Sequence, residues 1–256
     1  MKPKILTGVV VLMLSNLFYS SNCQNYDSTR TANRFGVVVT LTTKGISTVP
    51  NLTLGKPAVM FDMRAGKKLT FEPQFRFALE GKPWSFLFWW RYNLLSTQKF
   101  RLNIGMHPAI SFRTVTDTTS EMLKEYIRAD RYLAGEVSPA IVLSKNISIG
   151  MYYLYSRGLE KHITRNTHLI SFRTGISVNL SDKFYTRLTP QIYYLIMDQY
   201  NGYYFNSSLV AGHRDFPLSV SFLINKAIET HIPVGEDFLW NASLIYSFNA
   251  EYARKR

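Results

Sequence analysis

From residue 33 onward, apolar and polar side chains alternate along most of the chain. The stretch 101–112, which reads RLNIGMHPAISF, places large apolar side chains or proline on even positions and small or polar ones on odd positions. Because successive side chains of a β-strand point to opposite faces, this period of two indicates a strand with one apolar and one polar face. The same period recurs in 171–180 and 238–248, so the pattern predicts an all-β protein.

The alternation divides into twelve segments, which we predict to be strands. They are 33–43, 57–65, 69–80, 84–95, 99–114, 125–143, 147–157, 167–180, 184–198, 203–211, 217–226 and 238–248. Short turns are expected at 96–98, 144–146 and 181–183, and longer loops near 44–56, 115–124, 158–166 and 227–237. Short turns at one end and long loops at the other are typical of a transmembrane barrel.

The two faces of these strands favour a membrane barrel over an exported soluble sandwich. On one strand the apolar face carries Trp84, Phe86, Phe88, Trp90 and Tyr92, while the opposite faces of the strands carry small polar residues and arginine. Many segments reach about ten residues, the length that crosses a bilayer at a tilt. An open sheet edge would leave backbone groups unpaired in lipid. We therefore predict a closed antiparallel transmembrane β-barrel of about 12 strands, within a range of 10–14.

The N-terminus has the order of regions expected of a secretory signal peptide. Lys2 and Lys4 precede an apolar stretch at 5–18, and small residues follow up to Cys23. We predict that residues 1–23 are a signal peptide and that residues 24–256 form a single barrel domain. An alternative is that Cys23, the one cysteine of the chain, is lipidated; as a lone cysteine it excludes an intramolecular disulfide.

The pattern as a whole resembles bacterial outer-membrane β-barrel proteins over nearly all of the mature chain. Leu244, Tyr246 and Phe248 alternate as in the C-terminal assembly signal of that class, although residues 249–256 follow here. The start of the mature chain at Gln24 is similar to exported proteins of the Bacteroidetes type. The resemblance implies the outer membrane of a Gram-negative bacterium, contact with its lipid and lipopolysaccharide, and insertion by the barrel-assembly machinery through the terminal strand.

Side-chain parity assigns residues to the two faces of the barrel. The residues expected in an aromatic girdle facing lipid are Trp84, Trp90, Tyr92, Trp240, Tyr246 and Phe248. The arginines expected in the lumen are Arg64, Arg76, Arg91, Arg101, Arg113, Arg128, Arg173 and Arg187. The acids expected there are Asp62, Glu72, Glu80, Asp130 and Glu136. The same rule places Arg131 and Arg157 on the apolar face. Either these arginines contact lipid phosphates at the ends of their strands, or the predicted strand register is shifted by one residue there.

A lumen with more arginine than acid predicts a passive or weakly selective channel that favours anionic small solutes. The net charge is +13, and its scatter over strand-like segments argues against nucleic acid as the partner. If the arginines instead pair with the acids and fill the lumen, the barrel is a closed structural or surface-interaction protein that uses its long loops. The sequence alone leaves both readings open.

No catalytic, cofactor or metal motif is present in the sequence, so we expect no enzyme, cofactor or metal site. A membrane-embedded lipid hydrolase is kept as an alternative, because some barrels of this size carry a histidine–serine pair. Here His107 shares a face with Ser111, whereas His168 and Ser171 lie on opposite faces. The remaining histidines, His162, His213 and His231, are spaced too widely to indicate a metal site.

Overall fold

The computed structural model describes residues 33–117, 124–233 and 236–252. The predicted signal peptide and the question of Cys23 lie outside these residues. Within them, no helix has both the length and the apolar character needed to cross a membrane.

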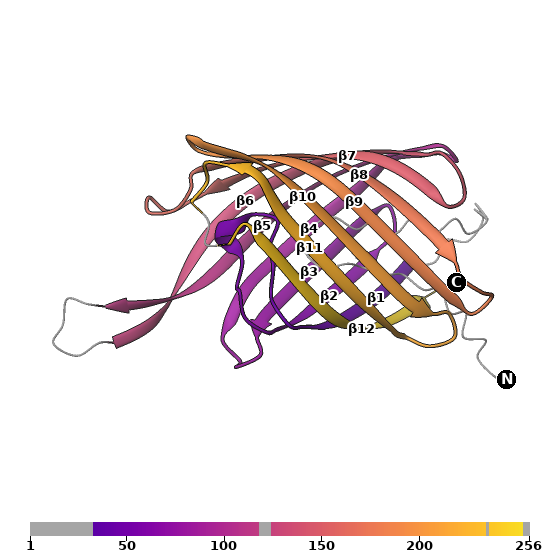
Figure 1. Cartoon of the computed structure of the whole chain (residues 1–256), viewed down its shortest axis with the longest axis horizontal. Helices are drawn as coiled ribbons and strands as arrows, with labels where there is room; N and C mark the ends of the chain where they lie inside the picture. Colours follow the sequence, from indigo (N-terminus) through magenta and orange to yellow (C-terminus); the bar gives the residue numbers. More distant parts are fainter. Residues whose placement is uncertain (1–32, 118–123, 234–235, 253–256) are drawn as a thin grey trace.

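Twelve antiparallel strands form one closed barrel in chain order, with β1 hydrogen-bonded to both β2 and β12 (Figure 1). The strands are β1 (Asn33–Thr42), β2 (Ala58–Gly66), β3 (Leu69–Ala78), β4 (Pro83–Ser96), β5 (Phe100–Asp117), β6 (Lys124–Val142), β7 (Ile147–Gly158), β8 (Asn166–Asn179), β9 (Phe184–Met197), β10 (Tyr200–His213), β11 (Leu218–Thr230) and β12 (Phe238–Tyr252). Each predicted segment corresponds to one of these strands, so the predicted fold class is confirmed.

The connections also follow the predicted alternation. One end of the barrel carries only short turns, such as those at 97–99 and 180–183, while the other carries the long loops 43–57, 159–165 and 231–237. At the long-loop end, β5 and β6 continue past the rest of the barrel as a projecting hairpin (Figure 1). The predicted segments 99–114 and 125–143 had placed the ends of these two strands closer to the barrel.

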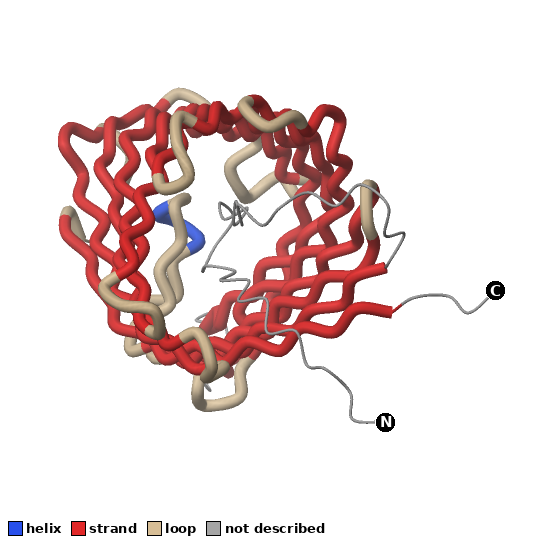
Figure 2. The backbone as a smooth tube through the Cα atoms, turned by 90° about the vertical axis from the view of Figure 1, so that its right-hand side faces the viewer, coloured by secondary structure: helices blue, strands red, loops and turns tan. Residues whose placement is uncertain are grey.

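The longest described loop folds inward rather than standing above the barrel. It contains the 3-10 turn η1 (Pro50–Leu52), which lies inside the ring of strands (Figure 2). Residues Ile46 to Val49 just before this turn are buried. The sequence predicted the length of this loop but not its direction.

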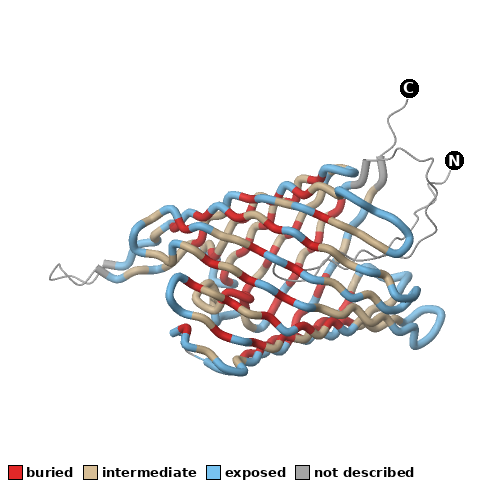
Figure 3. The backbone as a smooth tube through the Cα atoms, turned by 90° about the horizontal axis from the view of Figure 1, so that it is seen from above, coloured by how far each residue is buried: buried red, intermediate tan, exposed pale blue. Residues whose placement is uncertain are grey.

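Burial alternates along each strand, as Figure 3 shows, and the barrel is inverted relative to a soluble protein. Its exposed outer face is apolar, with Phe172 61% and Trp240 58% exposed. Its buried inner face is largely polar, and includes Asp62, Asn103 and Ser171. Soluble proteins seldom expose so large an apolar surface, because its transfer from water to an apolar medium is favourable by about 25 cal/mol per Å².

One girdle residue lies on the other face from the one we predicted. Trp84 is 3% exposed and its indole points into the barrel. The pairing of β3 with β4 shifts at this point, with Arg76 opposite Ser85 but Phe77 opposite Pro83. This bulge inserts an extra residue, so the alternation that places Phe86 outside does not extend to Trp84. The other five girdle positions, which lie on the outer face, are Trp90, Tyr92, Trp240, Tyr246 and Phe248.

Glu80 was also misplaced by the parity rule. The predicted strand 69–80 ends at Ala78, so Glu80 lies in the turn before β4. There its carboxylate forms an exposed ion pair with Lys56, at 3.5 Å. Glu80 is therefore part of the long-loop end and not of the lumen.

Candidate functional site

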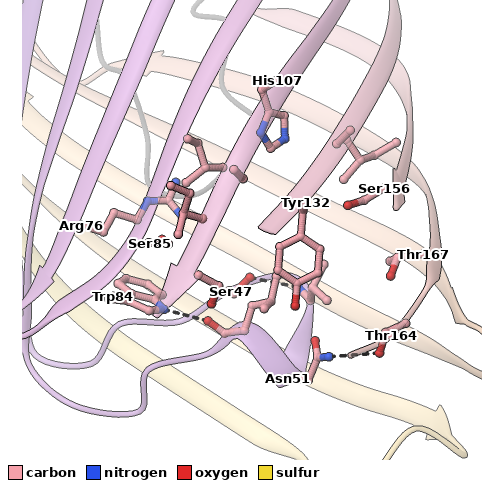
Figure 4. A pocket seen from close by; sticks show the side chains of 18 residues that line it. Ser47, Asn51, Arg76, Trp84, Ser85, His107, Tyr132, Ser156, Thr164 and Thr167 are labelled. Atoms are coloured by element: carbon pink, nitrogen blue, oxygen red, sulfur yellow. Dashed lines mark hydrogen bonds between the residues drawn. The ribbon is translucent and has the colours of Figure 1, made fainter. Parts of the chain in front are cut away.

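Three hydrogen bonds hold Asn51 and Leu52, at the tip of the inward loop 43–57. The indole Nε1 of Trp84 donates to the carbonyl oxygen of Leu52 at 2.8 Å, and the amide of Asn51 donates to Oγ1 of Thr164 at 3.4 Å (Figure 4). The guanidinium of Arg113 donates to the carbonyl oxygen of Asn51. These bonds join the loop to β4, to β5 and to the loop 159–165, so the loop narrows the mouth of the barrel.

A buried ion network runs along the inner wall of the barrel from β3 to β7. The guanidinium of Arg91 lies between two carboxylates: its Nε donates to Oε1 of Glu136 at 2.6 Å, and its Nη1 donates to Glu72. The hydroxyl of Tyr152 donates to Glu136 at 2.8 Å, and the Trp89 ring stacks on Arg91 with 4.0 Å from Cζ to the ring centroid. Side chains from β3, β4, β6 and β7 are therefore joined through one arginine.

Arg64 and Gly105 lie next to this network, and each contributes to it in its own way. The Nε of Arg64 lies 3.3 Å from Oε1 of Glu72 and adds a second cation to it. A Cβ at Gly105 would lie 2.9 Å from Oε1 of Glu136 and 3.0 Å from Cγ of Arg91. A side chain at position 105 would therefore push against the ion network.

A second charged cluster surrounds Asp130 near the long-loop end. Asp130 is fully buried, and its carboxylate accepts from Nε of Arg128 at 3.0 Å and lies 2.8 Å from Nε2 of His162. The guanidinium of Arg113 lies 3.9 Å away. The cluster fixes the loop that carries His162 against β6, and its basic groups outnumber its single acid.

The short-turn end of the lumen carries arginines that form no ion pairs among the described residues. Arg101 and Arg187 lie on the inner face near the starts of β5 and β9, and neither forms an ion pair within the described part of the chain. The two guanidinium groups act on each other as like charges. Arg173, further along the lumen, donates to Oγ of Ser138 at 2.6 Å and lies over the Tyr152 ring.

All eight predicted lumen arginines therefore lie on the inner face, but their surroundings differ. Four of them form ion pairs with lumen acids: Arg64, Arg91, Arg113 and Arg128. The sequence did not identify which arginines are paired. Arg76 is 3% exposed and donates to Oε1 of Gln74 at 2.9 Å. Parity places a residue on a face, but partners on non-adjacent strands depend on the barrel's curvature, which the alternation does not encode.

The sequence reasoning also missed an apolar band on the inner face, between the inward loop and the ion network. The band consists of Leu87, Trp89, Ala134, Tyr152, Leu154, Leu169, Tyr193, Leu195, Met197 and Tyr204, with Val49 and Ile232 from the loops. A signal was present in β9, where the run 192–197 is apolar on both faces. A strand that meets lipid on one side and water on the other would alternate there instead.

Part of this band lines a pocket beneath the inward loop, and the pocket is partly open to solvent (Figure 4). Its apolar wall includes Val49, Leu52, Leu87 and Leu154. Its polar residues include Arg76, His107, Ser111 and Tyr132, and no aspartate or glutamate lines it.

The histidine–serine pairs do not form a catalytic arrangement in the described chain. His107 packs against Trp89 with the two rings tilted by 43° and 3.9 Å between their centroids. Its Nδ1 lies 3.3 Å from the carbonyl oxygen of Pro108, and no hydrogen bond joins it to Ser111. His168 lies on the outer face, bonded to the hydroxyl of Tyr153. Ser171 lies on the inner face and donates to Gln191 at 3.3 Å. No group of three potential metal ligands occurs among the residues described.

Arg131 lies on the outer face, in register with its strand. Asp130 and Tyr132 on either side are buried, so the alternation holds at this point. The Arg131 guanidinium Nε donates to Glu160 at 2.7 Å, and its backbone N–H donates to the other carboxylate oxygen at 2.8 Å. Burial tends to raise the pKa of Glu160, but these bonds outweigh it and hold the pKa below its ordinary value.

The fold is similar to solved bacterial outer-membrane barrels. The translocator domain of the autotransporter NalP from Neisseria meningitidis matches with a TM-score of 0.51 and 9% identity, over 88% of this chain and 90% of that one. The NanC porin matches with a TM-score of 0.47 and 11% identity, over 86% and 100%. The KdgM porin in complex with disordered oligogalacturonate matches with a TM-score of 0.47 and 8% identity, over 84% and 99%.

No protein-family model matches the sequence, and no curated protein is significantly similar to it. At 9% identity, the likeness to the NalP domain shows the fold alone. The Bacteroidetes-like origin and the signal peptide stay predictions.

Proposed function

We propose that this protein is an outer-membrane channel with a basic lumen that favours anionic solutes. The observation that carries the proposal is the inverted barrel itself: an apolar outer face surrounds a polar inner face on which eight arginines face four buried acids. Those acids are Asp62, Glu72, Asp130 and Glu136. The outer face fits lipid and lipopolysaccharide, and the terminal strand would be the substrate of the barrel-assembly machinery.

The anion preference is assigned to the short-turn end. Arg101 and Arg187 there lack ion-pair partners among the described residues, so their charges are available to a passing solute. Arginines lining a pore favour anions, because a guanidinium stays charged and binds carboxylate and phosphate oxygens. The arginines of the ion network contribute less, because carboxylates offset them.

The test is a planar-bilayer recording with a KCl gradient across the membrane. The wild-type channel is expected to show discrete conductance and a reversal potential displaced toward that of chloride. The double variant Arg101→Gln with Arg187→Gln should move the reversal potential toward zero while conductance persists. The matched control is Arg131→Gln, which removes an arginine from the outer face and should leave the reversal potential unchanged.

A wild-type protein that inserts but never conducts, at any salt concentration, would overturn the channel proposal. The attachment of loop 43–57 within the mouth favours a closed structural or surface-interaction barrel as the second candidate. That candidate predicts no conductance and loss of partner binding when the long loops are shortened. Lipid turnover lost on Ser111→Ala would instead support the hydrolase alternative.

A further inference from the structure

The pocket beneath the inward loop has an apolar wall and several polar atoms without partners. Tyr132 is 8% exposed, and its hydroxyl has no hydrogen-bond partner in the described chain. The same holds for Nε of Arg76 and for Oδ1 of Asn51. A buried polar group without a partner costs about 1–3 kcal/mol, so such groups are rare unless a ligand or water completes them.

These polar atoms belong to residues that line one pocket (Figure 4). Arg76 and Tyr132 offer hydrogen-bond donors, and a guanidinium is suited to a carboxylate. Asp62 acts on Arg76 electrostatically, but the two form no ion pair within the described residues, and one Asp62 oxygen also lacks a partner. Nε of Arg76 is therefore not occupied by a carboxylate of the protein itself.

The rest of the lining selects against a strongly hydrated anion. Leu52, Leu87, Leu154 and Val49 surround the space, with the Trp84 ring beside Arg76 at 5.6 Å from Cζ to the ring centroid. A ligand that fits has an apolar body of several carbons and a single carboxylate.

From this arrangement we propose that the pocket binds amphipathic monocarboxylates, such as short aryl-alkanoic or medium-chain fatty acids. The Arg76 guanidinium binds the carboxylate, Tyr132 adds a hydrogen bond, and the leucines contact the apolar body. This proposal names a solute class for the channel and so rests on the proposed function. It is tested by equilibrium binding, which does not require conduction.

The experiment is equilibrium dialysis of the full protein in nanodiscs of neutral lipid, with 4-phenylbutanoate as the probe. Empty nanodiscs correct for partition into lipid. The comparison ligands are 4-phenylbutanol, which lacks the charge, and acetate, which lacks the apolar body. We expect saturable binding of phenylbutanoate, at least about tenfold tighter than either comparison ligand.

Three variants assign the contacts. Arg76→Gln is combined with Asp62→Asn so that no buried acid is left without its cation, and this pair should abolish the preference for phenylbutanoate over phenylbutanol. Tyr132→Phe, which keeps the ring in place, should weaken phenylbutanoate binding several-fold. Arg131→Gln is the matched control, an arginine of the outer face outside the pocket, and should leave the binding unchanged.

Phenylbutanol binding as tightly as phenylbutanoate, binding no greater than to empty nanodiscs, or equal binding by wild type and the Arg76 pair would each overturn the proposal. If the Arg76 pair fails to fold, Tyr132→Phe decides, because unchanged binding in that variant removes the assigned hydrogen bond. If the protein conducts but does not bind phenylbutanoate, the pocket proposal is rejected and the channel proposal stands. If it binds phenylbutanoate but does not conduct, the channel proposal is rejected and the pocket proposal stands.

Discussion

At the residue scale, the interior depends on a few buried charges that satisfy one another. Arg91 is 6% exposed and lies between Glu72 and Glu136, and Glu136 also accepts from Tyr152. Burying a charge is unfavourable unless its hydrogen-bonding capacity is met. Loss of one member should therefore destabilise the network. The alternating sequence pattern predicts that these arginine and acidic side chains face inward, but not which of them pair.

Glu136→Gln should destabilise the folded barrel, because it leaves Arg91 with one carboxylate in place of two. Since Glu72 remains, the expected loss is about 1.5–3 kcal/mol, the worth of a hydrogen bond to a charged group. The measurement is urea unfolding of the protein in lipid vesicles, followed by tryptophan fluorescence.

The matched control is Glu160→Gln, which breaks the ion pair to Arg131 on the outside. The Arg131 side chain is 67% exposed, and exposed pairs contribute about 0–1 kcal/mol. Equal losses for the two variants would show that burial does not distinguish these ion pairs.

At the element scale, the inward loop 43–57 is the largest departure from the regular barrel. Gly45 holds its base closed, since its N–H donates to the carbonyl oxygen of Lys56 at 2.8 Å and its own carbonyl accepts from Leu54 at 3.0 Å. Trp84 at the bulge then holds the tip. The sequence predicts a long loop, but neither the bulge nor the inward direction, because both depend on contacts between residues far apart in the chain.

Replacing residues 47–53 with a glycine–serine segment of equal length should raise single-channel conductance severalfold. The new segment keeps the chain length but loses Leu52, Asn51 and the buried Val49, so it no longer narrows the mouth. The measurement is the mean conductance step in a planar bilayer. The control is the same kind of replacement in residues 181–183, an exposed turn at the opposite end of the barrel.

An unchanged conductance in the first replacement and a raised one in the second would place the constriction elsewhere. A current of unchanged mean, with or without added noise, would also contradict the narrowing role assigned to loop 43–57.

At the scale of the whole molecule, the fold was predictable because the alternation of period two survives nearly everywhere. Strand number, order and most ends follow from it, since antiparallel neighbours joined by short turns need no long-range information. The arrangement of side chains inside the barrel could not be predicted from this alternation. The apolar band that includes Leu154 and Leu195, the pairing of Arg91 and the inversion of Trp84 are fixed only once the sheet closes.

Closure gives the last prediction, which concerns the molecule as one unit. The ladder between β1 and β12, running from Asn33 opposite Tyr252 to Thr42 opposite Ser243, leaves no sheet edge in the barrel. In lipid every backbone group is then paired, so unfolding requires many hydrogen bonds to break together.

Unboiled protein from outer-membrane fractions should therefore migrate faster on a denaturing gel than boiled protein. Proline at Val39, which removes a donor within β1, should abolish the fast band, whereas proline at Glu236 in the loop before β12 should not. A wild-type protein that stays in the soluble fraction and shows no shift on boiling would mean that the apolar outer face meets something other than lipid, and the channel and its pocket would lose their setting.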